Sequence, residues 1–297
     1  MKKVVLECIN VSKKIKNKTI LNNINLKLYE QDILGFIGPN GAGKTTTMKV
    51  ILSLCNYKEG YISICGYDIK NDYEKAISKV GAIIENPDLY TYLTGYQNLY
   101  LAAKIYNINK ERIEEVIKLL GLDRRIHDKV SKYSLGMKQR LGLAISILHK
   151  PKLLILDEPT NGLDPEAIKK LRYILKRISK QENMSILISS HNLSELETIC
   201  NKACIIKNGT ILSYYNLNNN KYTNNYIIEV SHTNINNIIN DYKKIDKHHI
   251  KVKTNKKNIP KIINKLVKNN ISIYKIIEEQ NSLEDIYLKI TRGNTID

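Results

Sequence analysis

The spacing of hydrophobic side chains divides the first two thirds of the chain into strands and helices that mostly alternate. Short apolar or alternating runs predict strands at residues 4–9, 19–28, 33–37, 60–66, 80–84, 152–157, 185–190, 203–207 and 210–213. Apolar residues three and four positions apart predict helices at 45–55, after Asp164 and after Asn192. The polar residues 13–18 are expected to form a turn. This alternation is typical of an α/β protein.

Residues from about 94 to 150 interrupt the alternation, because they predict helices only. The first helix starts at Thr94, Asn109 can cap a second that Gly121 closes, and a third covers 136–148 before Pro151. Residues 216–225 are polar and of low complexity, which predicts a linker. We therefore expect a domain at 1–215 with a helical subdomain at about 94–150, the linker 216–225, and a small C-terminal α+β domain at 226–297.

That C-terminal segment repeats strands and helices on a smaller scale and carries no motif with evident chemistry. Strands are predicted at 227–230, 250–252 and 271–277. Helices are predicted near 235–242, at 259–267 and after Ser282.

Composition limits the class of protein. No apolar run approaches the about 18 residues of a membrane span, and no secretory leader opens the chain. The net charge of +18 comes from scattered lysines in a chain rich in Asn, Ile and Tyr. This pattern indicates a codon bias rather than a dedicated nucleic-acid surface. Affinity for anionic lipid head groups is a simpler hypothesis for the charge than nucleic-acid binding. The five cysteines form no C-x-x-C pair, and we expect buried free thiols in a cytosolic protein.

One motif organises the chain and fits the phosphate-binding pattern G-x-x-x-x-G-K-[ST]: Gly38, Pro39, Asn40, Gly41, Ala42, Gly43, Lys44, Thr45 and Thr46. It joins a predicted strand to a predicted helix, the setting that phosphate binding requires. Glycines let backbone N–H groups point at an anion, and the helix adds its positive end. Lys44 would reach the phosphates, and the Thr45 hydroxyl would ligate Mg²⁺. An ordinary glycine-rich turn explains the complete motif poorly.

A pair of acids follows the buried run Leu153–Leu156. Hydrolysis of a nucleotide needs a carboxylate beside the metal and a group that polarises the attacking water. Asp157 is suited to the first role and Glu158 to the second. The alternative, a simple loop start, is a poor account of two acids after a buried strand in a chain with a phosphate loop.

Three further segments resemble the ATP-binding cassette (ABC) ATPases. Residues 134–141, Ser-Leu-Gly-Met-Lys-Gln-Arg-Leu, resemble the signature motif of that family, and residues 156–165 resemble its Walker B motif and D-loop. His191 matches the H-loop. The motifs follow the order and spacing of the family over residues 1 to about 213. The resemblance implies a P-loop NTPase core with an antiparallel β subdomain and a helical subdomain.

The resemblance also implies roles for individual residues. The phosphate loop and Thr46 would bind ATP with Mg²⁺, Asp157 would support the metal, Glu158 would be the catalytic base, and His191 would contact the γ-phosphate. Ser134 and Gly136 would contact the nucleotide of a second copy of the chain, and the D-loop residue Asp164 is placed with the nucleotide-contacting residues. Two copies would therefore enclose two ATP molecules.

Three departures from the family pattern narrow this resemblance. Ile15 stands where an aromatic ring usually stacks on adenine, which leaves GTP open as a substrate. Glu85 stands where the family usually has Gln; it can still contact Mg²⁺ or water and is counted with the catalytic and metal residues, but it adds negative charge. Leu135 and Met137 alter the signature motif. Together, Glu85 and residues 133–137 resemble the bacitracin- and lantibiotic-resistance subfamily.

The resemblance implies the ATPase subunit of an exporter of peptide antibiotics, at the cytoplasmic face of the cell membrane. Separate membrane permease subunits would supply the path, and residues 85–96, which are rich in aromatic side chains, would receive a coupling helix from them. Ordinary packing of the helical block is the alternative for that surface. Other cargo (sodium, lipid or another drug) stays open. A soluble ABC ATPase acting on ribosomes or DNA is disfavoured by the single phosphate loop and the lack of coiled-coil or zinc insertions.

Overall fold

The computed structural model describes residues 2–217, 224–235, 238–239, 241–279 and 283–292. The chain divides into two compact units, Met1–Tyr215 and Asn216–Asp297. Among the described residues, no helix is both long enough and apolar enough to cross a membrane. All five cysteines are free thiols; those at 8, 200 and 204 are buried, and those at 55 and 65 are half-buried.

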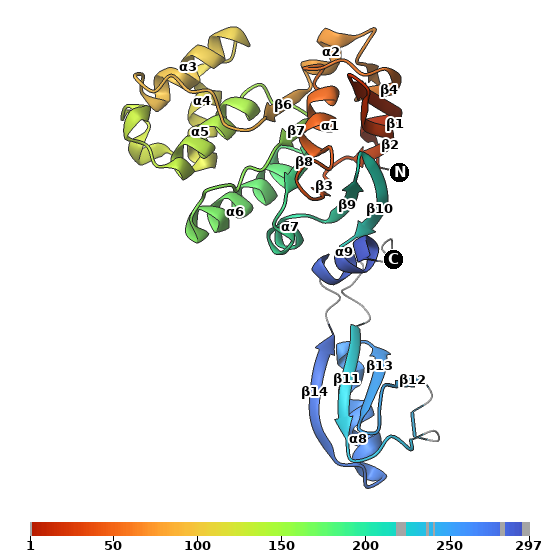
Figure 1. Cartoon of the computed structure of the whole chain (residues 1–297). Coiled ribbons are helices and arrows are strands. Elements are labelled where there is room, and N and C mark those ends of the chain that lie inside the picture. The colour runs from red at the N-terminus through yellow and green to blue at the C-terminus, as the bar shows by residue number, and fades with distance from the viewer. Residues whose placement is uncertain (1, 218–223, 236–237, 240, 280–282, 293–297) are drawn as a thin grey trace. The chain divides into compact units, whose positions relative to one another are not determined.

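The first unit contains two sheets (Figure 1). The larger sheet has the order β10-β9-β3-β8-β7-β6, and its strands are β3 (Ile33–Ile37), β6 (Val80–Ile83), β7 (Leu153–Leu156), β8 (Ser185–Ser190), β9 (Lys202–Lys207) and β10 (Thr210–Asn216). The five strands from β9 to β6 run parallel to their neighbours. Asn208 and Gly209 both have positive φ between β9 and β10, as a two-residue type I′ hairpin turn requires.

The smaller sheet is antiparallel, with the order β2-β1-β4-β5. It is built from β1 (Val4–Ile15), β2 (Lys18–Tyr29), β4 (Glu59–Ile64) and β5 (Tyr67–Asp68). Its apolar side chains share one core cluster with β3 and with Met48 and Ile51 of α1 (Lys44–Ile51). Because apolar side chains of α1 pack against residues of both sheets, the position of α1 is fixed, and so is that of the loop before it.

The two largest errors among the predicted boundaries of the first unit are at the end of β1 and at the end of α1. The turn predicted at 13–18 contains only Lys16 and Asn17, because β1 continues to Ile15 and pairs there with Lys18 of β2. The prediction was wrong because polar residues on a solvent-facing strand have the same sequence pattern as a loop. Helix α1 ends at Ile51 rather than at residue 55. Ser53 has a φ of 55°, and Leu54 N–H donates to Lys49 O at 2.8 Å, which is the hydrogen bond of a Schellman helix end.

The predicted helical block lies between β6 and β7. It consists of α3 (Gly95–Ile105), α4 (Lys110–Leu120) and α5 (Leu135–Ile147), which Figure 1 shows as a group beside the sheets. Thr94 and Gln97 form a reciprocal capping box on α3, Asn109 caps α4, and Gly121 closes α4 with a φ of 61°. Local sequence therefore sets these helix ends.

The remaining helices of the first unit are α2 (Tyr73–Ile77), α6 (Pro165–Gln181) and α7 (Leu193–Ile199). The helices predicted after Asp164 and Asn192 are confirmed, and these two residues cap them. Asp164 accepts a hydrogen bond from Ala167 N at 2.7 Å, and Asn192 accepts one from Glu195 N at 3.3 Å. Arg112 of α4 makes a double hydrogen bond with Glu182, just beyond α6, which fastens the helical block to the core.

The second unit is an antiparallel sheet of order β12-β13-β11-β14, with α8 against one face. Its elements are β11 (Asn224–Val230), β12 (Tyr242–Lys244), β13 (His249–Thr254), α8 (Ile259–Lys268), β14 (Ile273–Glu279) and α9 (Leu283–Arg292). The helix predicted near 235–242 is wrong at its end, because Tyr242 begins a strand. Residues 236, 237 and 240, most of the predicted linker, and the cap Ser282 lie outside the described residues.

Candidate functional site

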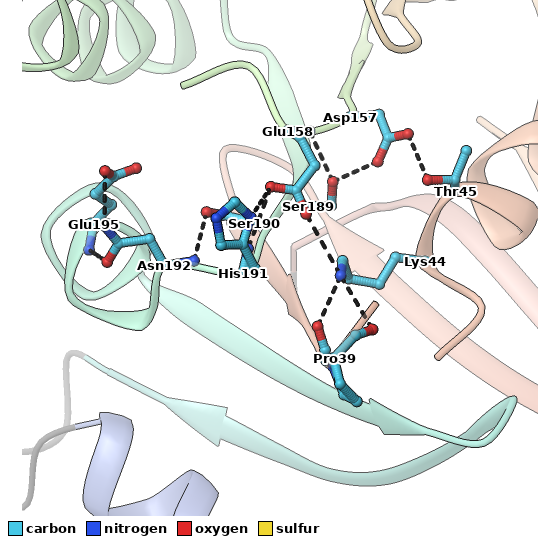
Figure 2. A network of polar contacts seen from close by, with 11 residues as sticks. Pro39, Lys44, Thr45, Asp157, Glu158, Ser189, Ser190, His191, Asn192 and Glu195 are labelled. Carbon is cyan, nitrogen blue, oxygen red and sulfur yellow. Dashed lines mark hydrogen bonds and ion pairs between the residues drawn. The ribbon is translucent and has the colours of Figure 1, made fainter. Parts of the chain in front are cut away.

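The candidate site lies where neighbouring parallel strands end. The phosphate loop follows β3, Asp157 and Glu158 follow β7, His191 follows β8, and Glu85 follows β6. Because the carboxyl ends of parallel strands meet at one edge of a sheet, segments far apart in sequence converge there. Figure 2 shows the polar contacts that join most of these segments.

The phosphate loop has the backbone form that its glycines permit. Gly41 and Gly43 have φ values of 78° and 108°, in the left-handed region that favours glycine. A Cβ at Gly38 would lie 2.4 Å from the carbonyl oxygen of Ile206, so that position has no room for a side chain. Gly43 precedes α1 without a side-chain cap. The first N–H groups of α1 are therefore available to an anion.

Lys44 is a buried cation held by neighbouring oxygens. Its side chain is 6% exposed, and its Nζ lies 3.5 Å from Glu158 Oε1. The same ammonium donates to the carbonyl oxygens of Gly38 at 2.7 Å and Pro39 at 3.4 Å. A buried charge needs such partners. Phosphate oxygens could replace the loop carbonyls as acceptors without leaving the ammonium unpaired.

Asp157 is also buried, and both of its carboxylate oxygens accept hydrogen bonds. Thr45 Oγ1 donates to Oδ2 at 2.7 Å, and Ser189 Oγ donates to Oδ1 at 2.6 Å. Hydroxyl and carboxylate oxygens are ligands that Mg²⁺ prefers, and that ion usually takes only one or two protein ligands beside phosphates. Thr45 and Asp157 therefore fit the metal that the motif implies.

Glu158 is held in place from several sides (Figure 2). Its Oε2 lies 2.8 Å from His191 Nδ1 and accepts the backbone N–H of His191 at 3.3 Å. Its own N–H donates to Ser189 Oγ at 2.9 Å, and its φ of 48° is unusual for a glutamate. This geometry directs a carboxylate toward Lys44 and the phosphate loop, where it could take a proton from water.

These residues border one cavity of about 470 Å³. It is lined by Ile15, Lys18, Ile20, Pro39, Asn40, Gly41, Gly43, Lys44, Thr45, Thr46, Glu158, Asn161 and His191. The size is within the usual range for a small-molecule site. The structure therefore brings Ile15 and most of the phosphate loop together with the acid–histidine pair.

Five residues at the site were not singled out from the sequence. Lys18 and Ile20 reach the cavity from β2, Asn161 from the segment after Glu158, and Ser189 lies behind Asp157. Lys49 pairs with Glu85. The Ser189-Ser190 pair before His191 was a usable signal, since hydroxyls at the end of a buried strand need partners. Lys18 and Lys49 carry no such signal in a chain with many lysines.

Seven predicted site residues do not line this cavity, and four of them have other contacts. Ser134 caps α5 by accepting Met137 N–H at 3.3 Å, and a Cβ at Gly136 would lie 3.0 Å from Ala167 Cβ. Asp164 serves as the cap of α6. Glu85 lies 2.9 Å from Lys49 Nζ. Gly38, Ala42 and Asp157 support the loop and the strand end from behind.

Comparison with known proteins gives consistent matches. The family model described as ABC transporter matches residues 21–161. The chain is 42% identical to YhcH of Bacillus subtilis, named an uncharacterized ABC transporter ATP-binding protein, over 97% of this chain and 96% of YhcH. It is 36% identical to BcrA of Bacillus licheniformis, named a bacitracin transport ATP-binding protein, over 98% and 99% of the two chains. A solved ATP-binding subunit of an ABC transporter, 32% identical, covers 72% of this chain and 91% of its own, with a TM-score of 0.64.

Proposed function

Because the chain belongs to the ABC transporter family of ATP-binding proteins, we propose that it powers an exporter of peptide antibiotics of the bacitracin or lantibiotic kind. Membership of this family and its fold confirms the resemblance drawn from the motifs, and makes the chain an ATP-hydrolysing enzyme. Separate membrane permease subunits would supply the path, and the chain would act at the cytoplasmic face of the membrane.

The phosphate loop would hold the triphosphate of ATP. Lys44 would exchange its bonds to the Gly38 and Pro39 carbonyls for phosphate oxygens, and the N–H groups of α1 would face the same anion. Thr45 and Asp157 would hold Mg²⁺, which when bound offsets the negative charge of the phosphates. Ile15 lines the cavity at the place where the adenine ring of ATP could bind.

Glu158 would act as the general base for hydrolysis. A water oxygen attacks the γ-phosphorus, the bond to the bridging oxygen of ADP breaks, and Glu158 takes a proton from the water. His191 would orient the carboxylate that it contacts and would face the γ-phosphate. The observation that carries this proposal is the position of Glu158, between Lys44 at 3.5 Å and His191 at 2.8 Å on one cavity wall.

The decisive variant is Glu158→Gln, which keeps the size of the side chain but removes the base. We expect ATP binding close to that of the wild type and hydrolysis slower by about 10²–10⁴-fold, the usual contribution of a general base. Glu59→Gln, at an exposed acid on β4, is the matched control. Turnover by Glu158→Gln at the rate of the control would refute the role.

The position of the signature motif supports a second copy of the chain as partner. Ser134 is exposed at the start of α5, and neither it nor Gly136 lines the cavity of its own chain. A helix N-terminus favours an anion, so the motif would bind the nucleotide of another copy. We expect Glu158→Gln to form a dimer on addition of ATP in light scattering after gel filtration, and Ser134→Arg in the same background to stay monomeric. A dimer that forms equally without ATP and in the presence of Ser134→Arg would contradict this arrangement.

A groove of about 570 Å³ is the proposed seat for a membrane subunit. Its lining includes Pro87 and Leu89 together with Tyr106 and Ile145 of the helical block. Tyr92, in the adjoining segment, is 68% exposed. A groove that combines apolar and polar side chains in this way can receive an amphipathic helix. Cell fractionation should find the protein at the membrane only when its membrane subunits are present; membrane binding in their absence would count against the groove.

The cargo is proposed from the name of BcrA, whose match includes both units of this chain. Loss of the gene should sensitise cells to bacitracin or to a lantibiotic. Complementation with the wild type should restore resistance, and Lys44→Ala should not. Unchanged resistance to both classes in the deletion strain would redirect the proposal to another cargo.

A further inference from the structure

Glu85 lies at the same sheet edge as the two acids of the site. Strand β6 ends two residues before it, and β6 pairs in parallel with β7. Asp157 N–H donates to Ile83 O at 2.9 Å, which fixes the two strand ends side by side. Glu85 therefore adds a third carboxylate to the edge that holds Asp157 and Glu158.

Lys49 approaches this edge from α1. It follows Thr45 by four residues, so both side chains lie on one face of the helix. Its Nζ lies 2.9 Å from Glu85 Oε1. The pKa of the Lys49 ammonium is raised, chiefly by that hydrogen bond and by the charge of Glu85, with a smaller contribution from the charge of Asp157. Lys49 is thus in electrostatic reach of two of the three acids.

The charge balance explains what such a lysine does. Three carboxylates lie at the sheet edge that borders the proposed nucleotide cavity, and Lys44 is already engaged with one of them. An amide at position 85 would add no charge, whereas a glutamate does. The φ of Glu85 is 66°, a backbone conformation that few residues other than glycine adopt. Its carboxylate is held by the contact with Lys49.

We propose that Lys49 is a positioning residue that neutralises Glu85 and holds its carboxylate beside the nucleotide site. Lys49 and Glu85 then act as one unit, in which the lysine makes a glutamate acceptable next to a triphosphate. This inference rests on the proposed function, since it assigns ATP to the cavity at Lys44.

The pair does not act through stability. Both side chains are partly exposed, and ion pairs of this kind contribute little to folding. Lys75 and Asp72 form a pair at the same distance of 2.9 Å, and the pKa of Lys75 is raised in the same way. That pair joins the N-cap residue of α2 to its first turn, outside the nucleotide cavity, so it is a matched control.

The test is a double-mutant cycle on the full chain with Lys49→Gln, Glu85→Gln and both together. The measured quantity is the Kd of a fluorescent ATP analogue in EDTA, where Mg²⁺ cannot mask repulsion between Glu85 and the phosphates. We expect Lys49→Gln to weaken binding by about three- to tenfold, and by less than about twofold when residue 85 is Gln. The loss should shrink at high salt, which screens exposed charges. Lys75→Gln should bind as the wild type does.

Two results would overturn the inference. An equal loss in both backgrounds would mean that Lys49 acts on the nucleotide directly. No loss in either would make the pair an ordinary surface contact. Lys44→Ala distinguishes failure of this inference from failure of the proposed function. Tight ATP binding by that variant would overturn the proposed nucleotide site, and the inference about Lys49 with it.

Discussion

Replacing Ser189 with alanine should uncouple the two acids of the site from the sheet that holds them. Ser189 is fully buried at the end of β8. Its hydroxyl donates to Asp157 Oδ1 at 2.6 Å and accepts the N–H of Glu158 at 2.9 Å. One oxygen atom therefore sets the orientation of the proposed metal ligand and the backbone of the proposed base.

The cost of removing this hydroxyl follows from its two partners. A hydrogen bond to a charged group contributes about 1.5–3 kcal/mol, and a bond between neutral groups about 0.5–1.5 kcal/mol. Asp157 is only 2% exposed, so water cannot easily replace the lost donor. We expect a loss of about 2–4 kcal/mol in the free energy of unfolding, which for a unit of this size lowers Tm on the order of 10 °C.

Ser185 provides the matched control on the same strand. It is equally buried, but its hydroxyl donates to a neutral acceptor, Tyr29 O, at 3.0 Å. Thermal unfolding of Ser185→Ala should therefore show a loss of about 1 kcal/mol. ATPase assays should show a kcat near that of the wild type for Ser185→Ala and a kcat lower by about tenfold or more for Ser189→Ala, since a misplaced base loses most of its effect. Equal losses of stability in the two variants would refute the reasoning.

Three further outcomes are expected. Arg112→Ala should cost about 3–5 kcal/mol in urea unfolding, because it leaves Glu182 unpaired where the helical block joins the core; a change under about 1 kcal/mol would contradict this. Ile15→Tyr should tighten ATP binding by about two- to tenfold through stacking on the base, as measured by titration; unchanged affinity would place the base elsewhere. Burial lowers the pKa of His149, whose Nε2–H donates to Val80 O at 3.0 Å. Because the unfolded chain then binds the proton first, stability should fall as pH drops below the ordinary value of about 6.5. His149→Phe should flatten that dependence in unfolding experiments, and an unchanged pH dependence in this variant would contradict the assignment.

Much of the first unit follows from short stretches of sequence. The phosphate loop between a strand and a helix, the buried strand before Asp157, and the caps at Thr94, Asn109 and Asp164 depend on residues only a few positions apart. Such local signals determine element type and helix ends well. The end of β1 was missed because its partner strand, rather than its own residues, satisfies its backbone.

The contacts that complete the site could not be predicted in this way. Ser189 meets Asp157 across 32 positions of the sequence, and Lys49 meets Glu85 across 36. Pairing of this kind depends on the order of strands in the sheet, which the hydrophobic pattern does not specify. In a chain with many lysines, nothing marks Lys49 before α1 and β6 are placed.

The segment that contains Glu85 connects the helical block to the sheet edge that carries the site. A Cβ at Gly142 of α5 would lie 2.3 Å from Pro87 Cβ, so α5 and the segment after Glu85 are in direct contact. Lys49, Glu85 and Pro87 also line the groove proposed for a membrane subunit. A partner seated there would press on the segment whose carboxylate Lys49 holds. Because an exposed ion pair contributes about 0–1 kcal/mol, a small movement of α5 or of the partner is enough to break it. If a membrane subunit docks at the groove as proposed, the Lys49–Glu85 pair would be the place where docking changes the charge beside Thr45 and Asp157.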